Sequence, residues 1–193
     1  MKRELAALAV LYLVAHLLYL PPTLEDIDSV NFALGVRDFD VADHRPHPPG
    51  YPVYIAMGKV VAAVTGPLSG GAGASTVEAR ALSVVSLLAA IAATFLVFRV
   101  FAAPRATRAE EAPWRTLDVP ALATTALTMT CPMVWALTIR PMSDLPGLAL
   151  ALAAQACFLA AWWWQTTPEG VDLRMSPDTL TTSGRMIVLG ALL

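Results

Sequence analysis

Long apolar runs alternate with short polar stretches along most of this 193-residue chain. A helix needs about 20 apolar residues to cross a bilayer. Four runs of roughly this length contain no Asp, Glu, Lys or Arg, and they lie at 5–24, 81–98, 119–139 and 145–168. The pattern therefore predicts an all-α fold, a polytopic bundle of membrane helices over about 4–20, 80–102, 119–139 and 145–164, with the start of another at 186.

The composition supports a membrane protein and limits its partners. Charged residues make up 15% of the chain, against about 25% in soluble domains. The net charge is −2 and no basic stretch alternates with aromatic residues, which argues against a nucleic-acid partner. Cys131 and Cys157 lie in apolar runs, where no disulfide is indicated. Because 186–193 is apolar again, we expect 1–193 to be one transmembrane domain, the N-terminal part of a larger bundle.

The segment 51–66 decides which polar loops share one side of the membrane. It is apolar but short and contains Lys59, and a lysine at the centre of a bilayer costs about 2.5–3.5 kcal/mol. If it does not span, the arginine-containing loop 103–118 joins the basic N-terminus on the cytoplasmic side, as short basic loops prefer. We therefore predict that 51–66 is an interfacial helix within a large external loop, 21–79. In the alternative model, 51–66 spans and every later loop changes sides.

The start of the external loop predicts a helix with several carboxylates. Thr23 and Asp26 have the spacing of a capping box, which would start a helix over about 24–37. This gives Asp26 a structural role at the helix N-terminus. Asp28 has no such local role and is the main catalytic candidate, with Glu25 and Asp26 as secondary candidates. One face of this helix is apolar, formed by Ile27, Val30 and Leu34.

Two of the three histidines lie in the proline-rich stretch 42–52, ADHRPHPPGYP. Its prolines exclude a helix and stiffen the chain, and a rigid loop can hold a site or serve as a plain connector. A zinc site needs three or four ligands. His44 and His47 alone do not support a metal site, so we predict none.

Three further charged residues lie at the predicted helix ends. Arg80 would open the second helix and Arg140 would close the third, while Asp144 precedes the fourth. An arginine at such a boundary can anchor the helix end among lipid headgroups, or bind a phosphate through its paired N–H groups. Asp144 can likewise serve as a helix cap before Pro146. If 51–66 lies at the interface, all these residues share the external face with Asp28 and His47.

Four motifs, taken in the order in which they occur along the chain, resemble the GT-C superfamily of integral membrane glycosyltransferases. This superfamily includes protein O-mannosyltransferases and lipid A aminoarabinose transferases. The motifs are 28-DSVNFA-33, 47-HPPGYP-52, 79-ARAL-82 and 140-RPMSDLPG-147. The resemblance spans about two thirds of the chain. It implies a helical bundle whose first external loop lies on the membrane, and a sugar donor carried on polyprenyl phosphate. Asp28 corresponds to the catalytic carboxylate of the family, and Asp144 to its second external aspartate.

The resemblance also implies a reaction. A sugar moves from the polyprenyl phosphate to an acceptor hydroxyl with inversion, Asp28 acts as base, and His47, Arg80 or Arg140 stabilises the phosphate that leaves. No cofactor is implied, and a divalent metal is not supported. Many members have a second acidic residue where this chain has Ser29. Other family residues that bind the donor lie in later helices, so the resemblance implies that this chain, as the N-terminal part of a larger bundle, lacks part of the donor site.

Two other functions remain compatible with the sequence. A transporter or scramblase core would need helices broken near the bilayer centre, and Pro132 is the one candidate for such a break. A non-catalytic membrane fragment would need no site at all. For the enzyme, the expected partners are the polyprenyl-phosphate sugar donor, a hydroxyl acceptor and the lipid bilayer. We expect a multi-pass protein of a prokaryotic plasma membrane, with the active face external.

Overall fold

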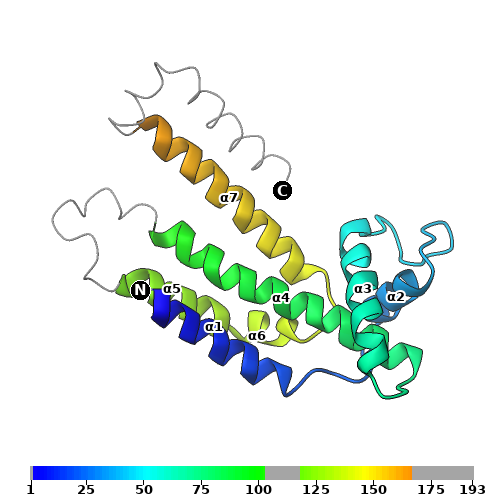
Figure 1. Ribbon diagram of the computed structural model, residues 1–193. Helices are drawn as coiled ribbons and strands as arrows, with labels where there is room; N and C mark the ends of the chain where they lie inside the picture. The colour runs from blue at the N-terminus through cyan, green and yellow to red at the C-terminus, as the bar shows by residue number, and fades with distance from the viewer. Residues whose placement is uncertain (1, 103–117, 167–193) are drawn as a thin grey trace.

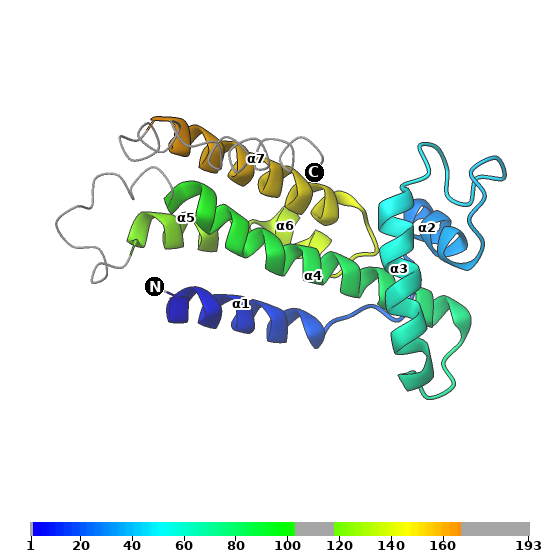
Figure 2. The same cartoon turned by 45° about the horizontal axis from the view of Figure 1, so that its top comes forward.

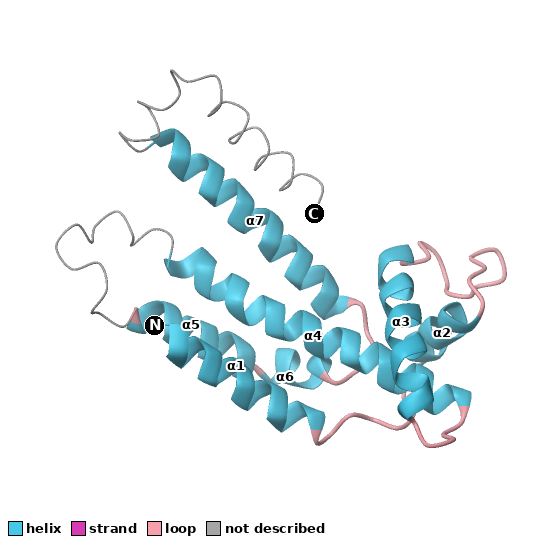
Figure 3. Ribbon diagram, viewed as in Figure 1, coloured by secondary structure: helices cyan, strands magenta, loops and turns pink. Residues whose placement is uncertain are grey.

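The computed structural model describes residues 2–102 and 118–166, and within them the chain is helical with no β-strand (Figures 1 and 3). The expected start of a helix at 186 and the loop 103–117 lie outside the described residues. The helices are α1 (Lys2–Leu17), α2 (Ile27–Arg37), α3 (Pro52–Thr65), the 3₁₀ helix η1 (Gly66–Leu68), α4 (Ala74–Ala102), α5 (Val119–Thr130), α6 (Pro132–Thr138) and α7 (Asp144–Thr166).

Helix α4 is the centre of the fold. It contacts α1, α5, α6 and α7 along its length, and α2 and α3 near its start. Figures 1 and 2 show α2 and α3 at one end of α4, and the N-terminus of α1 and the start of α5 at the other. In Figure 2, α3 runs across the direction of α4. The predicted interfacial segment 51–66 is thus a helix that crosses one end of the longer helices.

Two helices of the described residues are long and apolar enough to cross a membrane, α4 and the Asp144–Trp162 part of α7. The bent pair of α5 and α6 makes a third if it counts as one span. The predicted first span, 4–20, does not reach this length, because α1 ends at Leu17 after 16 residues. The chain leaves the helix shortly before Pro21 and Pro22, and a residue that precedes a proline disfavours helical geometry.

The predicted single helix over 119–139 is wrong in one respect. It breaks at Cys131, and α5 and α6 meet at a bend of 64°. Pro132 has no N–H to donate and its ring disfavours a helical Cys131, whose ψ of 129° is extended. The break therefore follows directly from the proline.

Helix α4 begins at Ala74, earlier than the predicted 80. Gly70 and Gly71 precede it in a turn, both with positive φ, which glycine adopts without steric cost. Arg80 therefore lies in the second turn of α4 and does not open the helix. The additional turn carries Glu78, to which Arg37 at the end of α2 donates two hydrogen bonds.

Gly58 allows α3 to pack closely against α4 and α2. A Cβ at this position would lie 2.8 Å from Leu82 Cδ2 and 2.8 Å from Val36 Cγ2, and both neighbours are buried. We expect Gly58→Ala to lower the free energy of unfolding by about 1–3 kcal/mol, the usual cost of overpacking, despite the better helix propensity of alanine.

Gly66→Ala is the control for this substitution, because its Cβ would meet nothing closer than Val77 Cγ1 at 3.6 Å. Thermal unfolding of both variants in the same detergent measures the difference. A Gly58→Ala variant as stable as the parent would contradict the close packing of α3.

Candidate functional site

The first turn of α2 is fixed by a capping box that begins three residues later than predicted. Asp26 is the N-cap, not the third helical residue, and its carboxylate accepts a hydrogen bond of 2.7 Å from Ser29 N–H. Ser29 Oγ accepts in return from Asp26 N–H at 3.2 Å. Thr23 has no part in this cap. Ser29 is fully buried, so this position serves the helix.

Asp28 follows in the first turn of α2, half-exposed, and faces His47. Its Oδ1 lies 3.9 Å from His47 Nε2, and the two side chains are 45% and 29% exposed. The other ring nitrogen of His47, Nδ1, lies 3.5 Å from Asn31 Nδ2. An amide N–H pointing at Nδ1 favours the tautomer with its proton on Nε2, the nitrogen nearest the Asp28 carboxylate. The structure thus brings together Asp28 and His47, and it adds Asn31, which sequence reasoning did not select.

Two aromatic rings pack against the His47 ring of this pair. Phe32 packs against His47 with ring centres 5.9 Å apart, and against Tyr51 at 5.1 Å. Tyr51 also contacts His47 edge-on at 5.5 Å. Phe32 is 2% exposed. The Asp28–His47 pair therefore lies at the boundary between solvent and an aromatic cluster.

The proline-rich loop returns His47 to α2 through a compact turn. Arg45 ties the turn together, since its guanidinium lies 2.6 Å from Asp38 and 2.8 Å from Asp43. The backbones of Asp40 and Arg45 exchange two hydrogen bonds of 2.7 Å. Gly50 has a φ of +89°, and a Cβ there would lie 2.7 Å from Val41 Cγ2. His44 lies within this turn and is not part of the Asp28 pair.

The remaining candidates lie at the same end of the long helices but do not all meet. Arg140, in the turn before α7, lies 3.6 Å from Glu25, and both side chains are half-exposed. Asp144 is exposed in the first turn of α7, where a carboxylate is favourable. Arg80 is exposed and has no ion pair with the described residues. The structure therefore gives Arg140 a neighbour in the first loop and leaves Arg80 outside the group.

An ion pair that sequence reasoning missed joins the end of α2 to the start of α4. Arg37 donates two hydrogen bonds to Glu78, Nε to Oε1 at 2.9 Å and Nη2 to Oε2 at 2.8 Å. The Glu78 side chain is 8% exposed, and that of Arg37 is 53% exposed. The hydrogen bonds to Glu78 raise the pKa of Arg37 above its ordinary value. This pair fixes the helix that carries Asp28 relative to α4.

Because the two partners differ in burial, their removal has unequal effects. Arg37→Leu leaves a buried carboxylate without its cation, which is costly, whereas Glu78→Leu leaves a half-exposed guanidinium that water can solvate. We therefore expect Arg37→Leu to lower the melting temperature more than Glu78→Leu. Thermal unfolding checks this, with Arg80→Leu as an exposed control on α4. Equal effects of the two substitutions would contradict the buried pair.

An apolar groove of about 570 Å³ shares one residue, Tyr51, with the surroundings of the Asp28–His47 pair. Its walls come from α3 with the residues just before it, from α4 and from the start of α7. Tyr51, whose ring contacts His47, lines the groove, and so does Ser143, the neighbour of Asp144. The other lining residues are almost all apolar and include Met57, Leu88, Ala92, Gly147 and Leu150. Tyr51 thus connects the Asp28–His47 pair to an apolar groove, and this combination fits a molecule with a polar head and an apolar chain.

One face of α3 and part of α2 expose large apolar side chains. On α3 and η1 they recur at helical spacing, at Val53, Met57, Val60, Val64 and Leu68. The predicted apolar stripe of α2 is also turned outward, since Ile27 is 77% and Val30 41% exposed. The buried face of α2 is a different one, with Ser29, Phe32, Ala33, Gly35 and Val36. These exposed stripes suit contact with lipid.

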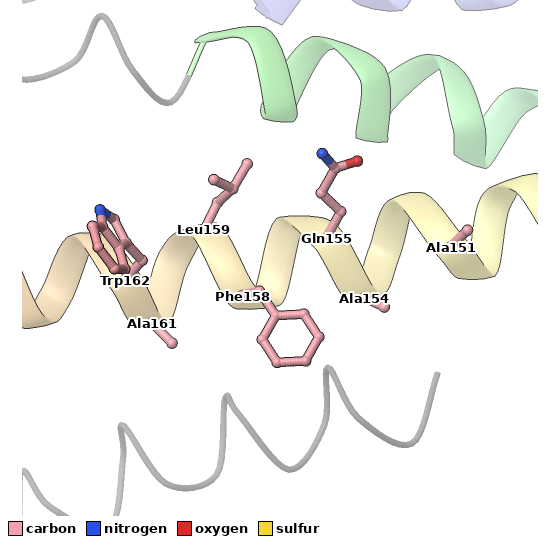
Figure 4. Close-up of a pocket in the computed structure, with 7 residues that line it drawn as sticks. All are labelled: Ala151, Ala154, Gln155, Phe158, Leu159, Ala161 and Trp162. Atoms are coloured by element: carbon pink, nitrogen blue, oxygen red, sulfur yellow. The ribbon is translucent and has the colours of Figure 1, made fainter.

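A second hollow lies along α7, away from the polar candidates (Figure 4). In that view Gln155 and Leu159 point toward α4, whereas Ala154 and Phe158 point away from it. Among the described residues that line this hollow, Gln155 is the one with a side-chain amide. None of these described side chains is ionisable, and none belongs to the candidate site.

Comparison with known proteins does not assign the chain to a class. No family model matches it, and neither a curated protein nor a solved structure matches it. Within residues 2–102 and 118–166, no three His, Cys, Asp or Glu side chains are grouped so that they could hold a metal ion.

Proposed function

We propose that this chain forms part of a membrane glycosyltransferase that moves a sugar from a polyprenyl phosphate to an acceptor hydroxyl. The observation that carries the proposal is the Asp28–His47 pair, connected through Tyr51 to an apolar groove. The groove suits a long apolar chain, and the half-exposed carboxylate suits a proton acceptor that meets a second substrate from water. The GT-C resemblance of the sequence motifs points to the same substrate class.

In the proposed reaction, the acceptor hydroxyl attacks the anomeric carbon as the bond from that carbon to the phosphate oxygen breaks. Asp28 takes the hydroxyl proton. His47 orients the Asp28 carboxylate through its Nε2–H. A nearby cation stabilises the negative charge of the polyprenyl phosphate that leaves. Arg140, which lies 3.6 Å from Glu25, is our candidate for that cation, and it would exchange Glu25 for the phosphate. Direct displacement inverts the anomeric centre.

The membrane setting of the proposal has its own support. The exposed apolar stripes of α2 and α3 would rest on one bilayer surface, with α4 and α7 crossing below them. The polar pair would then lie at the depth of the headgroups, where a lipid phosphate lies. We propose that this surface is the external one, in a multi-pass protein of a prokaryotic plasma membrane.

Binding and turnover of the donor test the proposal separately. The chain is reconstituted in nanodiscs and given a polyprenyl-phosphate mannose with a labelled sugar. We expect retention of the phosphate-bearing lipid over the matching polyprenol without phosphate, and release of the sugar to an added alcohol with inversion. Equal retention of the two lipids, with no release of sugar, would exclude the proposed substrate class.

One observation favours a different function, a transporter or scramblase core. Broken helices line the binding sites of many transporters, and the α5–α6 pair is broken at Pro132 with a bend of 64°. A transporter would also place charged residues within its spans. The two candidate spans, α4 and Asp144–Trp162, carry only a few, which are Glu78, Arg80 and Arg99 in α4 and Asp144. A fluorescent-lipid flip assay in vesicles distinguishes this function, since a glycosyltransferase would leave the lipid distribution unchanged.

A further inference from the structure

The turn that carries Arg140 is held on both sides by side-chain hydrogen bonds from other helices. Before Arg140, the hydroxyl of Tyr12 in α1 lies 2.5 Å from Thr138 Oγ1, at the end of α6. After it, the hydroxyl of Ser86 in α4 donates to the carbonyl oxygen of Met142 at 2.9 Å. Tyr12 is 4% exposed, and Ser86 and Thr138 are fully buried. Two helices thus fix the chain at two residues to each side of Arg140.

The direction of the first bond follows from the other contact of Thr138. Its hydroxyl donates to the carbonyl oxygen of Val134 at 2.7 Å, so its lone pairs are left to accept. The Tyr12 hydroxyl is therefore the donor to Thr138. Ser86 also lies 3.3 Å from the carbonyl oxygen four residues earlier in α4, the bond that a helical serine commonly makes. Its closer partner is Met142, so Ser86 ties α4 to the turn.

The backbone between the two anchors is also fixed, whereas the Arg140 side chain is not. Met142 N–H donates to the Arg140 carbonyl at 2.8 Å, and Pro141 is fully buried. The guanidinium is half-exposed and lies 3.6 Å from Glu25, and an exposed ion pair of this kind contributes little. The base of the side chain is thus held in place while its charged end can exchange partners.

The anchored turn also packs against the residues that support the Asp28–His47 pair. Met142 packs on the buried cluster that contains Phe32, and the Phe32 ring packs against His47. Buried contacts therefore set the place of the Arg140 backbone relative to the pair, independently of the exposed contact with the first loop.

We propose that Tyr12 and Ser86 are positioning residues for Arg140, and that their hydrogen bonds hold its guanidinium where it binds the phosphate of a lipid. This inference rests on the proposed function, because it takes Arg140 as the cation that meets the phosphate. An arginine recognises phosphate through aligned, paired N–H groups, and a preorganised base lowers the entropy that such pairing costs. Neither Tyr12 nor Ser86 is among the described residues that line the groove, so both act through Arg140.

The test measures phosphate selectivity, the dissociation constant of a polyprenol divided by that of the matching polyprenyl phosphate, for the chain in nanodiscs. Arg140→Gln should lower this ratio by about 10-fold to 100-fold, since a hydrogen bond to a charged group is lost. Tyr12→Phe and Ser86→Ala should each lower it by about 3-fold to 10-fold, as one neutral hydrogen bond is lost. Neither should change the affinity for the polyprenol. A role in folding alone would weaken the binding of both lipids equally and leave the ratio unchanged.

Thr94→Ala is the matched control, because it removes a fully buried hydroxyl of α4 that donates to the Ala90 carbonyl of the same helix at 3.0 Å. It should leave the selectivity at the value of the parent. Tyr12→Phe should have no further effect on selectivity when it is added to Arg140→Gln, since it acts through Arg140.

The outcomes separate this inference from the proposed function. Parent-like selectivity of Tyr12→Phe or Ser86→Ala, with Arg140→Gln impaired, would overturn the role of that residue and leave the proposed function standing. Full selectivity of Arg140→Gln, or additive effects of Tyr12→Phe and Arg140→Gln, would overturn the inference because the two residues would not act together. A parent that binds the two lipids equally would overturn the proposed function and the inference with it.

Discussion

Replacement of Asp28 by asparagine is expected to lower sugar transfer by about 10³-fold, within the range that general base catalysis contributes. Asparagine has nearly the same shape but cannot accept the proton of the acceptor hydroxyl. Because Asp28 lies outside the capping box of α2, the variant should unfold at the temperature of the parent. Binding of the polyprenyl-phosphate donor should weaken far less than turnover, since the groove and Arg140 are unchanged.

Asp43→Asn is the matched control for this variant. Asp43 is a more exposed carboxylate of the same loop, and its partner is Arg45 at 2.8 Å, so we expect transfer close to that of the parent. The measurement is the initial rate of sugar release from the labelled donor in nanodiscs. Equal rates in Asp28→Asn and the parent would remove Asp28 from the mechanism.

Filling the apolar groove should have the second largest effect. Gly147 lines it at the start of α7, and a Cβ at this position would meet no atom within 4 Å. A tryptophan there has space to enter the groove and displace part of the polyprenyl chain. Burial of a CH₂ contributes about 0.8 kcal/mol, so losing one five-carbon unit costs about 3–4 kcal/mol, or more than 100-fold in donor affinity.

The control for the groove is Gly147→Ala, which adds one methyl group and should bind the donor nearly as well as the parent. Titration of the polyprenyl phosphate into nanodiscs that contain each variant gives the affinities. A Gly147→Trp variant that is folded and still binds the lipid normally would show that the chain of the donor lies elsewhere.

Local patterns predicted the helices well but not all their ends. The apolar segment 51–66 was expected to be a helix and is one, α3. A capping box was predicted for this helix, but with Thr23 as its N-cap. The sequence contains two overlapping patterns of this kind, Thr23 with Asp26 and Asp26 with Ser29, and only the backbone conformation decides between them. The break at Cys131 was foreseen only as a feature of the transporter alternative, although a proline inside an apolar run is a sufficient reason for it.

Local sequence patterns could not predict contacts between residues that are far apart in the sequence. Arg37 and Glu78 are far apart in the sequence, and nothing near either residue indicates that α2 ends beside the start of α4. Asn31 was passed over for a similar reason, since its partner His47 arrives through a folded turn. The groove is formed by residues of three helices, α3, α4 and α7, so the sequence of any one apolar segment does not predict it. By contrast, Asp28 and His47 were selected from their residue types and neighbours, and the structure brings them within 3.9 Å.

The proposed function requires Asp28, Arg140 and α3 to lie at one face of the membrane, and cysteine labelling from each side tests this most directly. Cys131 and Cys157 are first replaced, and single cysteines are then placed at Leu68, Arg140 and Val119. The account predicts that 68 and 140 react with an impermeant reagent from the same side and that 119, at the far end of the long helices, reacts from the other. Labelling of 68 and 140 from opposite sides would mean that α3 spans the bilayer, and it would contradict the composite site.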